Sequence, residues 1–275
     1  MARLAVIGGT GVYEAGILQG VEDRTLVTPY GTVDAQSGTM RGPSGRESEV
    51  VFLTRHGRAH SVPPHRVNYR ANIWALRMLG VERVIGTGAV GSLKLEMRPG
   101  DCVLVDQFLD FTHGRAATFF EGEGASPGAG LGPGLGAGVV HTDMTEPYCP
   151  ELRRALREAS EAAGVTLHDG ACYACTQGPR FESAAEIRMF RGLGADVVGM
   201  TNVPEVVLAR ELGLCYALVA MVTNYAAGIT GKPLTHAEVV ETMRENVRKI
   251  RALAWRALDA VPGERKCGCG KQVVR

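Results

Sequence analysis

Long hydrophobic runs are missing from this sequence. No stretch of the 275-residue chain approaches the roughly 18 consecutive apolar residues of a membrane span. The apolar start "MARLAVIGGTG" is interrupted at Gly8 and is too short for the core of a secretory signal. We therefore expect a cytoplasmic protein that does not insert into a membrane.

An excess of one charge is also missing. The formal net charge is +1 and 45% of the residues are hydrophobic, which is typical of an ordinary globular protein. A protein that holds a phosphate backbone mainly by charge would be strongly basic. Neither nucleic acid nor a membrane surface is an expected partner. With no internal repeat or interdomain linker, we predict one domain over residues 1–262 and a flexible C-terminal tail over 263–275.

A disulfide framework is absent as well, because the seven cysteines are scattered and odd in number. Cys172 and Cys175 form a C-x-x-C pair on an expected strand, where their spacing points them to opposite faces, so we interpret them as small buried hydrophobic residues. Cys267 and Cys269 form a C-x-C pair in the polar tail. Two interpretations remain open for this pair: a C-x-C link or redox-active pair, and an ordinary tail without such chemistry.

Short apolar runs alternate with amphipathic segments from end to end. Continuous β-branched runs predict buried strands at residues 4–9, 49–57, 83–91, 102–108, 195–201 and 214–224, and a further strand within 169–178. Helical spacing of apolar residues, followed by a glycine, predicts helices at 68–80, 149–164, 182–194 and 203–213. A last helix is expected from Thr235 to Ala260, with Thr235 and Glu238 as a capping box. The alternation predicts an α/β fold with a largely parallel, helix-covered sheet.

Two glycine-rich segments imitate nucleotide-binding motifs. "GGTGVYEAG" follows the first strand, but Glu14 stands where a dinucleotide fingerprint needs its third glycine. "AAGITGKP" has Ala226 in place of the first glycine of a phosphate loop and Pro233 in place of the Ser or Thr. We expect no nucleotide cofactor.

Three histidines lie close together in "RHGRAHSVPPH", at His56, His60 and His65. Prolines prevent a helix there, and no nearby cysteine or carboxylate completes a metal shell. We expect no metal at these residues.

Polar groups and glycines gather where the predicted strands end, which in such sheets is the edge that binds ligands. The segments are residues 8–11, residues 55–57, residues 87–91 and the pair Met200 and Thr201. Two hydroxyls, a guanidinium and freed backbone N–H groups can converge on a small oxyanion. The pattern favours a site for free phosphate, although each glycine alone is also explained by a tight turn.

Several motifs in order resemble one known family. They are "VIGGTGVY", "RHGRAH", "VNYRANIWAL", "GAVGSL", "PGDCVLVDQFLDFT", "TQGPRFESAAE", "GMTNVPEVVLARELGLCYA" and "MVTNYAAG". The sequence resembles the purine nucleoside phosphorylase and methylthioadenosine phosphorylase family over roughly residues 3 to 258.

This resemblance implies a fold, a reaction and an assembly. The expected fold is one α/β domain around a mixed sheet. The expected reaction is phosphorolysis, in which a purine nucleoside and phosphate give a free base and ribose 1-phosphate, as in purine salvage. Inorganic phosphate is then a co-substrate and no cofactor is needed. The family is usually trimeric, so we expect a homotrimer or a dimer of trimers in which a neighbouring subunit closes each site.

The resemblance also assigns roles to individual residues. It places phosphate on Thr10, Arg55, His56, Ala89 and Thr201, which agrees with the strand-end set. It places the sugar against Met200 and the base near Phe181. His141 matches the position that reaches into the neighbouring subunit's site.

Asn224, at the end of the last predicted strand, matches the residue that contacts the purine. Its NH2 group can serve O6 of a 6-oxopurine while its carbonyl holds a proton on N7. A flipped amide would suit adenine equally well. Asn224 alone therefore does not distinguish a 6-oxopurine from adenine. With either base it would stabilise the leaving purine.

Glu182, in "GPRFES", separates the two bases. An ionised carboxylate only accepts hydrogen bonds, and a 6-oxopurine carries N1–H whereas adenine has a lone pair there. The methylthioadenosine branch resembles "GPRFSS" at this motif and carries aspartates around Asn224 and Ala226. We predict a 6-oxopurine nucleoside phosphorylase acting on inosine and guanosine. An exposed residue in the first turn of a helix is the alternative for Glu182.

His236 aligns with the position that hydrogen-bonds a 5′-hydroxyl, where methylthio-specific members are apolar. A solvent-facing histidine at a helix start remains the other interpretation. The alternative function is phosphorolysis of 5′-methylthioinosine or 5′-methylthioadenosine. A nucleoside-binding regulatory protein without turnover is the rival from another class, and Arg55, His56 and Asn224, all being present, speak against it.

Overall fold

The computed structural model describes residues 3–9, 18–57, 59, 61–122, 140–230, 236–270 and 273–274. One large sheet contains β1 (Arg3–Gly8), β2 (Gln19–Thr28), β3 (Gly31–Arg41), β4 (Glu47–Thr54), β5 (Val81–Ser92), β6 (Cys102–Leu104), β7 (Gln107–Phe111), β9 (Leu167–Asp169), β10 (Cys172–Thr176), β11 (Val197–Gly199) and β12 (Cys215–Tyr225). A small second sheet pairs β8 (His141–Thr142) with β13 (Val273–Val274).

The large sheet is mixed and largely parallel. Its main path runs β2-β3-β4-β1-β5-β11-β10-β7, and β12 joins it beside β5 and continues through β6 to β9. Parallel pairs join β1 to β4 and β5, β12 to β5, and β10 to β7 and β11. The predicted single-domain α/β architecture with a mixed, largely parallel sheet is confirmed.

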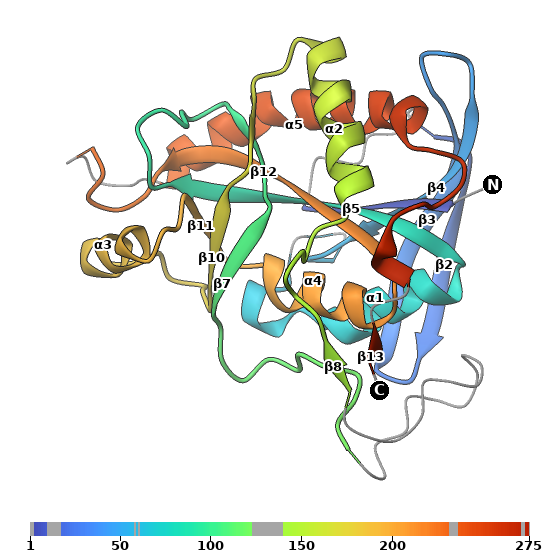
Figure 1. The fold of residues 1–275 in the computed structure, drawn as a ribbon, viewed down its shortest axis with the longest axis horizontal. Coiled ribbons are helices and arrows are strands. Elements are labelled where there is room, and N and C mark those ends of the chain that lie inside the picture. Colours follow the sequence, from blue (N-terminus) through green and yellow to red (C-terminus); the bar gives the residue numbers. More distant parts are fainter. Residues whose placement is uncertain are drawn as a thin grey trace.

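Helices cover both faces of this sheet (Figure 1). α1 (Tyr69–Met78) and α4 (Asn202–Glu211) pack on one face, where Ile73, Leu76 and Leu208 join the larger core cluster. α2 (Pro150–Ala163) and α5 (His236–Ala260) cover the other face. α3 (Ala184–Gly192) packs at the end of the sheet beyond β10 and β11. Within the described residues, none of the helices combines the length and the apolar character that crossing a membrane requires.

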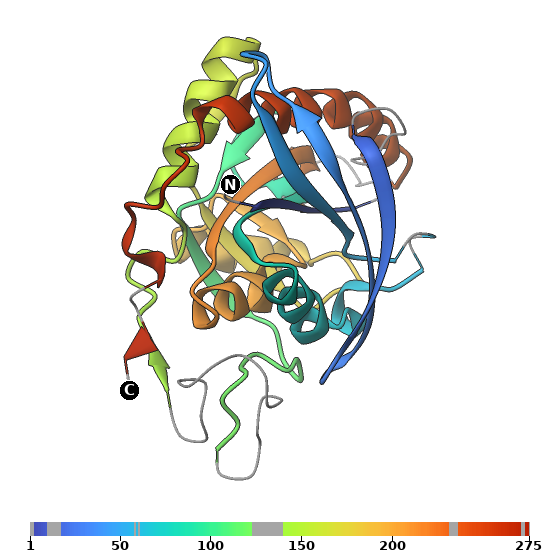
Figure 2. The same cartoon turned by 90° about the vertical axis from the view of Figure 1, so that its right-hand side faces the viewer.

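The hairpin of β2 and β3 was not foreseen from the sequence. β2 is exposed over almost its whole length, and β3 buries only alternate residues such as Val33 and Ala35. Neither strand therefore has the continuous apolar run of a strand buried on both faces. Figure 2 shows these long strands, in blue, forming one side of the molecule.

The predicted strand at residues 102–108 is two strands. Val105 donates its backbone N–H to Leu218, whereas Asp106 donates to Ala171. The chain thus leaves its neighbour β12 and joins β10 within two residues, although the apolar run continues through the change.

Helix ends follow the expected chemistry. α2 ends at Gly164 in the left-handed conformation, with φ at 64°. α3 begins with a capping box in which Ser183 and Glu186 bond reciprocally to each other's backbone N–H groups. The capping box predicted for Thr235 and Glu238 is not placed, because Thr235 and the Glu238 side chain lie outside the described part of the structure.

Candidate active site

The centre of the site is the place where β5 changes neighbours. Along one edge, β5 pairs with β1 as far as Gly86 and then with β11 from Gly91 onward, in the opposite direction. Along its other edge it stays beside β12 throughout. Residues 87–90 therefore lie between two partners, at a switch point of the kind where α/β sheets bind ligands.

Two predicted phosphate residues meet at this switch point. Ala89 is exposed on β5, and its carbonyl lies close to Gly199 at the end of β11. Thr201 precedes α4, is buried, and makes no side-chain capping bond to the helix. A Cβ on Gly88 would lie 3.6 Å from the Thr201 hydroxyl oxygen. The small residues of β5 thus place backbone groups beside a hydroxyl at a helix N-terminus, an arrangement that favours anions.

Arg55 reaches the same place from the end of β4. It donates from Nε and Nη2 to the Glu205 carboxylate at 2.6 and 2.7 Å, and from Nη1 to the Thr87 carbonyl at 2.7 Å. Burial alone would lower the pKa of Arg55, but the charge of Glu205 and its hydrogen bonds raise it above its ordinary value. Among the described residues these bonds use three of the five guanidinium N–H groups, which leaves two for an anion beside Thr87.

His56 is held next to Arg55 by its ring. Its Nδ1 lies 2.8 Å from the Val62 carbonyl oxygen, and because a carbonyl only accepts, Nδ1 carries the hydrogen. The side chain is buried. The neutral ring then presents Nε2 as an acceptor and the protonated ring presents it as a donor.

Two of the predicted ligands cannot be placed. Thr10 lies outside the described residues. His236 is the first residue of α5, and its side chain lies outside the described part of the structure.

The predicted base-reading carboxylate follows β10. Glu182 accepts a hydrogen bond of 2.6 Å from the Thr176 hydroxyl at the end of that strand, and Thr176 also reaches the Gly199 carbonyl at 3.4 Å. Gly178 in the intervening loop has φ at 61°, and a Cβ there would lie 2.5 Å from the sulfur of Met200. Only glycine allows this approach. The structure thus brings the Glu182 loop against the residue predicted to contact the sugar.

Phe181, the predicted stacking residue, precedes Glu182 in the same loop. It is 46% exposed, which is high for a large aromatic side chain. An exposed ring beside a held carboxylate is suited to packing against a flat heterocycle.

Asn224 is aimed by an irregularity in β12. The pairing of β12 with β5 shifts between Val222 and Asn224, so Thr223 is an extra residue and Asn224 lies opposite Gly91. Such bulges re-aim side chains, and they are common next to active sites. The amide accepts from the Thr223 hydroxyl at 2.8 Å and donates to the Tyr225 carbonyl at 2.9 Å. A buried strand thereby ends in an oriented, half-buried amide.

The chain after Asn224 lies against the helix that follows Glu182. A Cβ on Gly228 would be 2.9 Å from the Cβ of Ala184, at the start of α3. Ala226 belongs to the same apolar cluster as Ile187 and Phe190 of α3. The two predicted base-reading residues therefore come from adjoining segments.

Two supporting residues were missed from the sequence. Glu205 holds Arg55 and also accepts from the Tyr216 hydroxyl at 2.6 Å. A carboxylate inside an almost wholly buried helix, here α4, is the sequence feature that could have revealed it. Arg115 donates to the backbone carbonyls of Thr176, Gln177 and Val203 at 3.1, 2.9 and 2.6 Å. Arg115 thus ties the end of β10 to the start of α4, and nothing in its local sequence indicates this.

His141 lies elsewhere in the molecule. It is exposed on β8, beside the C-terminal strand β13, and Figure 1 shows this pair well away from α3. The structure does not bring His141 together with the other predicted residues of the same chain.

The prediction that both cysteines of the C-x-x-C pair are buried holds for Cys175 and is wrong for Cys172. Cys175 is fully buried in the main core, whereas Cys172, three residues earlier on β10, is half-buried outside that cluster. The C-x-C pair differs from an unpacked tail, because Cys269 is buried and residues 268–270 form a turn of 3-10 helix.

The chain thus combines a mixed α/β sheet with polar side chains that gather where neighbouring strands end or change partners. The model of the phosphorylase superfamily matches residues 3–259, and the chain belongs to that family.

Similar proteins include 6-oxopurine nucleoside phosphorylases and methylthioadenosine phosphorylases. The chain is 54% identical to a probable 6-oxopurine nucleoside phosphorylase of Moorella thermoacetica over 97% of this chain and 96% of that one. It is 47% identical to the S-methyl-5'-thioadenosine phosphorylase of Pyrococcus furiosus over 98% and 96%. A crystal structure of methylthioadenosine phosphorylase from an antarctic soil metagenomic library superposes with a TM-score of 0.87 at 33% identity, covering 99% of this chain and 91% of that one.

Proposed function

We propose that this enzyme cleaves 6-oxopurine nucleosides, inosine and guanosine, with inorganic phosphate to give the free base and ribose 1-phosphate. The observation that carries the proposal is the Glu182 carboxylate, held by the Thr176 hydroxyl at 2.6 Å beside Phe181. Because Thr176 donates this bond, Glu182 accepts it and keeps its acceptor character toward a ligand. A carboxylate in this position pairs with N1–H of hypoxanthine or guanine and faces the N1 lone pair of adenine.

Phosphate would be held at the switch point of β5. Arg55 supplies charge and two N–H groups, while the Thr201 hydroxyl, the Ala89 backbone, His56 and Thr10 fix its direction. In the reaction, a phosphate oxygen bonds to C1′ of the ribose as the C1′–N9 bond breaks. The bonding electrons leave with the purine, and the phosphate dianion offsets the positive charge that develops on the sugar.

Asn224 would stabilise the departing base. Negative charge builds on the purine as the bond lengthens, and a proton reaches N7. An amide that meets both O6 and N7–H bonds more strongly to the departing base than to the intact nucleoside. Met200 would contact the sugar, and the ring of Phe181 would orient the heterocycle.

The alternative substrates carry a 5′-methylthio group. This alternative is supported by relatives named S-methyl-5'-thioadenosine phosphorylase and probable S-methyl-5'-thioinosine phosphorylase, at 46 to 47% identity. His236, as a donor or acceptor for a 5′-hydroxyl, supports inosine instead.

The assembly and setting complete the proposal. In a homotrimer, or a dimer of trimers, His141 of each subunit would lie at a neighbour's site. The exposure of His141 and the separation of β8 from α3 within one subunit agree with this. The proposed setting is cytoplasmic purine salvage.

A substrate panel tests the assignment. Initial rates are measured for inosine, guanosine, adenosine, 5′-methylthioinosine and 5′-methylthioadenosine, each with and without phosphate. We expect turnover of inosine and guanosine that requires phosphate. Phosphate-independent turnover would indicate hydrolysis, and preference for adenosine or for a methylthio nucleoside would reject the proposed substrate.

A further inference from the structure

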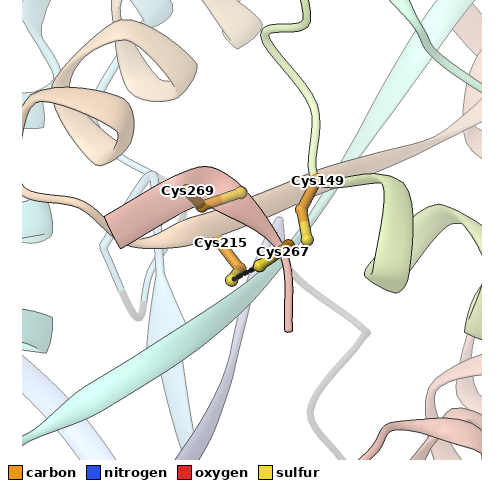
Figure 3. A group of neighbouring side chains, drawn as sticks. All are labelled: Cys149, Cys215, Cys267 and Cys269. Carbon is orange, nitrogen blue, oxygen red and sulfur yellow. Dashed lines mark hydrogen bonds between the residues drawn. The ribbon is translucent and has the colours of Figure 1, made fainter. Parts of the chain in front are cut away.

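Four cysteines from three distant parts of the chain meet at one point (Figure 3). Cys149 immediately precedes α2, Cys215 begins β12, and Cys267 and Cys269 belong to the C-terminal segment. Their sulfur atoms all lie within 4.8 Å of one another. Cys149, Cys215 and Cys269 are buried and Cys267 is half-buried.

The sulfur spacing matches four ligands around one ion. The Sγ atoms of Cys215 and Cys267 are 3.3 Å apart, well beyond the S–S bond length of about 2.0 Å. Zinc–thiolate bonds of about 2.3 Å in a tetrahedron place the sulfurs roughly 3.8 Å apart. The Cys215–Cys267 distance of 3.3 Å is a little shorter than this value, and the 4.8 Å limit that holds for every pair is a little longer.

The cluster has no counterpart in the part of the chain that the structure describes. Within the described residues, no other set of three or more His, Cys, Asp or Glu side chains has ligand atoms close enough to hold a metal ion. All four donors are thiols, the set that structural zinc sites use and that leaves no open position for catalysis.

Buried arginines beside the cluster supply matching charge. Four thiolates and one divalent cation carry a net charge of −2, which needs compensation in a buried place. Arg83 lies beside Cys215 in the register of β5 and β12, and it is 1% exposed. Among the described residues, its three guanidinium nitrogens have no hydrogen-bond partner. Its ion-pair partner is the Glu82 carboxylate at 3.8 Å, whose side chain is 46% exposed, so thiolates would supply further compensation.

Two further arginines approach from other sides. Arg210 is 2% exposed, interacts electrostatically with Cys269, and has two nitrogens without a hydrogen-bond partner among the described residues. Arg265 lies beside Cys215 and donates to the Gly213 carbonyl at 2.8 Å. Arginines therefore approach the four sulfurs on several sides, while the buried Glu151 carboxylate accepts from the Lys266 backbone N–H at 2.8 Å.

We propose that Cys149, Cys215, Cys267 and Cys269 bind one Zn²⁺ ion as a structural tetrathiolate site that fastens the C-terminal segment to the α/β domain. Glycines fit the segment to this place, since a Cβ on Gly213 would lie only 3.4 Å from the Cα of Gly270. The zinc site does not depend on which nucleoside the enzyme uses.

The site has a consequence for the far end of the chain. Only three residues separate Cys269 from β13, which pairs with β8 through Val274 and His141. A metal at the cysteines would hold β13 in reach of β8, and so would fix the backbone of His141. Loss of the metal is expected to loosen this pair before the large sheet.

Metal and thiol contents test the proposal directly. The full chain is reduced, freed of metal with a chelator and titrated with ZnSO₄ under anaerobic conditions against a chromophoric competitor. We expect one zinc per chain, and seven thiols titrating with a thiol reagent in denaturant and chelator before any reductant is added. Absence of stoichiometric zinc binding, or cystines in place of the four thiols, would overturn it.

Variants distinguish three possibilities for the four cysteines: that they bind a metal, form disulfides or only pack against one another. Cys267→Ser/Cys269→Ser is expected to lose the zinc and the effect of chelator on Tm, whereas Cys172→Ser, outside the cluster, keeps both. Cys267→His replaces one zinc ligand by another, so it should retain one metal and change the visible spectrum of the Co²⁺-loaded protein. A Cys267→His variant that binds no metal, while folded by circular dichroism, contradicts the assignment.

Discussion

The two halves of the candidate site are built differently. The phosphate half rests on a buried ion pair, in which the side chains of Arg55 and Glu205 are 1% and 0% exposed. The base half rests on a loop and a bulge, with Phe181 46% exposed and Glu182 held by a single hydroxyl. The core fixes the phosphate half, whereas the loop that carries Phe181 and Glu182 can change without disturbing the core.

This difference explains how one fold can serve different purines. Relatives at 46 to 54% identity are named for 6-oxopurine nucleosides, methylthioinosine or methylthioadenosine, while the phosphorylase family is common to all. Phosphate is the shared substrate of a phosphorylase, so its half of the site has reason to be rigid. In the proposed site the base would be recognised by few residues, of which Phe181 and Glu182 lie on a loop.

The largest effect is expected from breaking the buried pair. Glu205→Gln removes the charge opposite Arg55 and should lower the free energy of unfolding by about 3 to 5 kcal/mol, because it leaves a buried cation uncompensated. Urea unfolding measures this loss, with the KM for phosphate as a second readout.

Glu211→Gln is the matched control, since Glu211 is also a buried carboxylate of α4. Burial raises the pKa of Glu211, and it bonds Thr118 and Phe119 rather than Arg55. Equal destabilisation by the two variants would contradict a special role for the Arg55 pair.

A smaller effect, confined to turnover, is expected at the bulge. Asn224→Ala should lower kcat about 100-fold or more, by comparison with loss of an oxyanion-type donor. The KM for phosphate should change little, because Asn224 belongs to the base half. Steady-state kinetics on inosine measures both. Tyr225→Phe, next in the strand, should turn over normally, and a normal kcat in Asn224→Ala would remove the amide from the mechanism.

Substrate preference should shift toward adenosine when Glu182 and Asn224 are both replaced. In Glu182→Ser/Asn224→Asp, the mismatch with adenine N1 is relieved, a difference of about 1 to 3 kcal/mol. The ratio of kcat/KM for adenosine to that for inosine should therefore rise by about one to two orders of magnitude. An unchanged ratio would show that these residues do not read the base.

The smallest effect concerns the helix that carries the base loop. Hydrogen bonds from Arg180 lower the pKa of Glu186 from 4.5 to about 2. A lowered folded-state pKa stabilises the protein above pH 4.5, and this contribution is lost as pH falls toward 2. Because the Glu186 side chain is one-third exposed, solvent screening reduces the contribution.

Glu186→Gln tests this directly. It should cost about 0.5 to 1 kcal/mol at pH 7, through the weakened Arg180 pair, and nearly nothing at pH 2, since Gln still accepts the capping-box hydrogen bond. Thermal unfolding at several pH values measures the difference. A cost that stays constant down to pH 2 would contradict the titration.

Much of the sheet was predictable because its central strands are buried on both faces. The runs at residues 83–91 and 214–224 became β5 and β12, which carry the site. The exposed hairpin of β2 and β3 has no such run, so its pairing depends on contacts that the local pattern does not contain. The turn from β6 to β7 was hidden because apolar residues continue through it.

The strand pattern placed two candidate site residues correctly at strand ends, Arg55 directly after β4 and Asn224 near the end of β12, whereas Ala89 lies inside β5. Supporting groups were not predictable, because Arg115 acts through three backbone carbonyls of distant segments. The four-cysteine cluster was missed for a related reason. Only Cys267 and Cys269 are close in sequence, and the fold alone brings Cys149 and Cys215 to them.

The most direct test of the account is a crystal structure with phosphate and hypoxanthine bound. We expect phosphate at Arg55 and Thr201, the Glu182 carboxylate within hydrogen-bond distance of N1, and the Asn224 amide at O6 and N7. A structure in which Glu182 and Asn224 both turn away from the bound base would contradict the substrate assignment, even with phosphate in its predicted place.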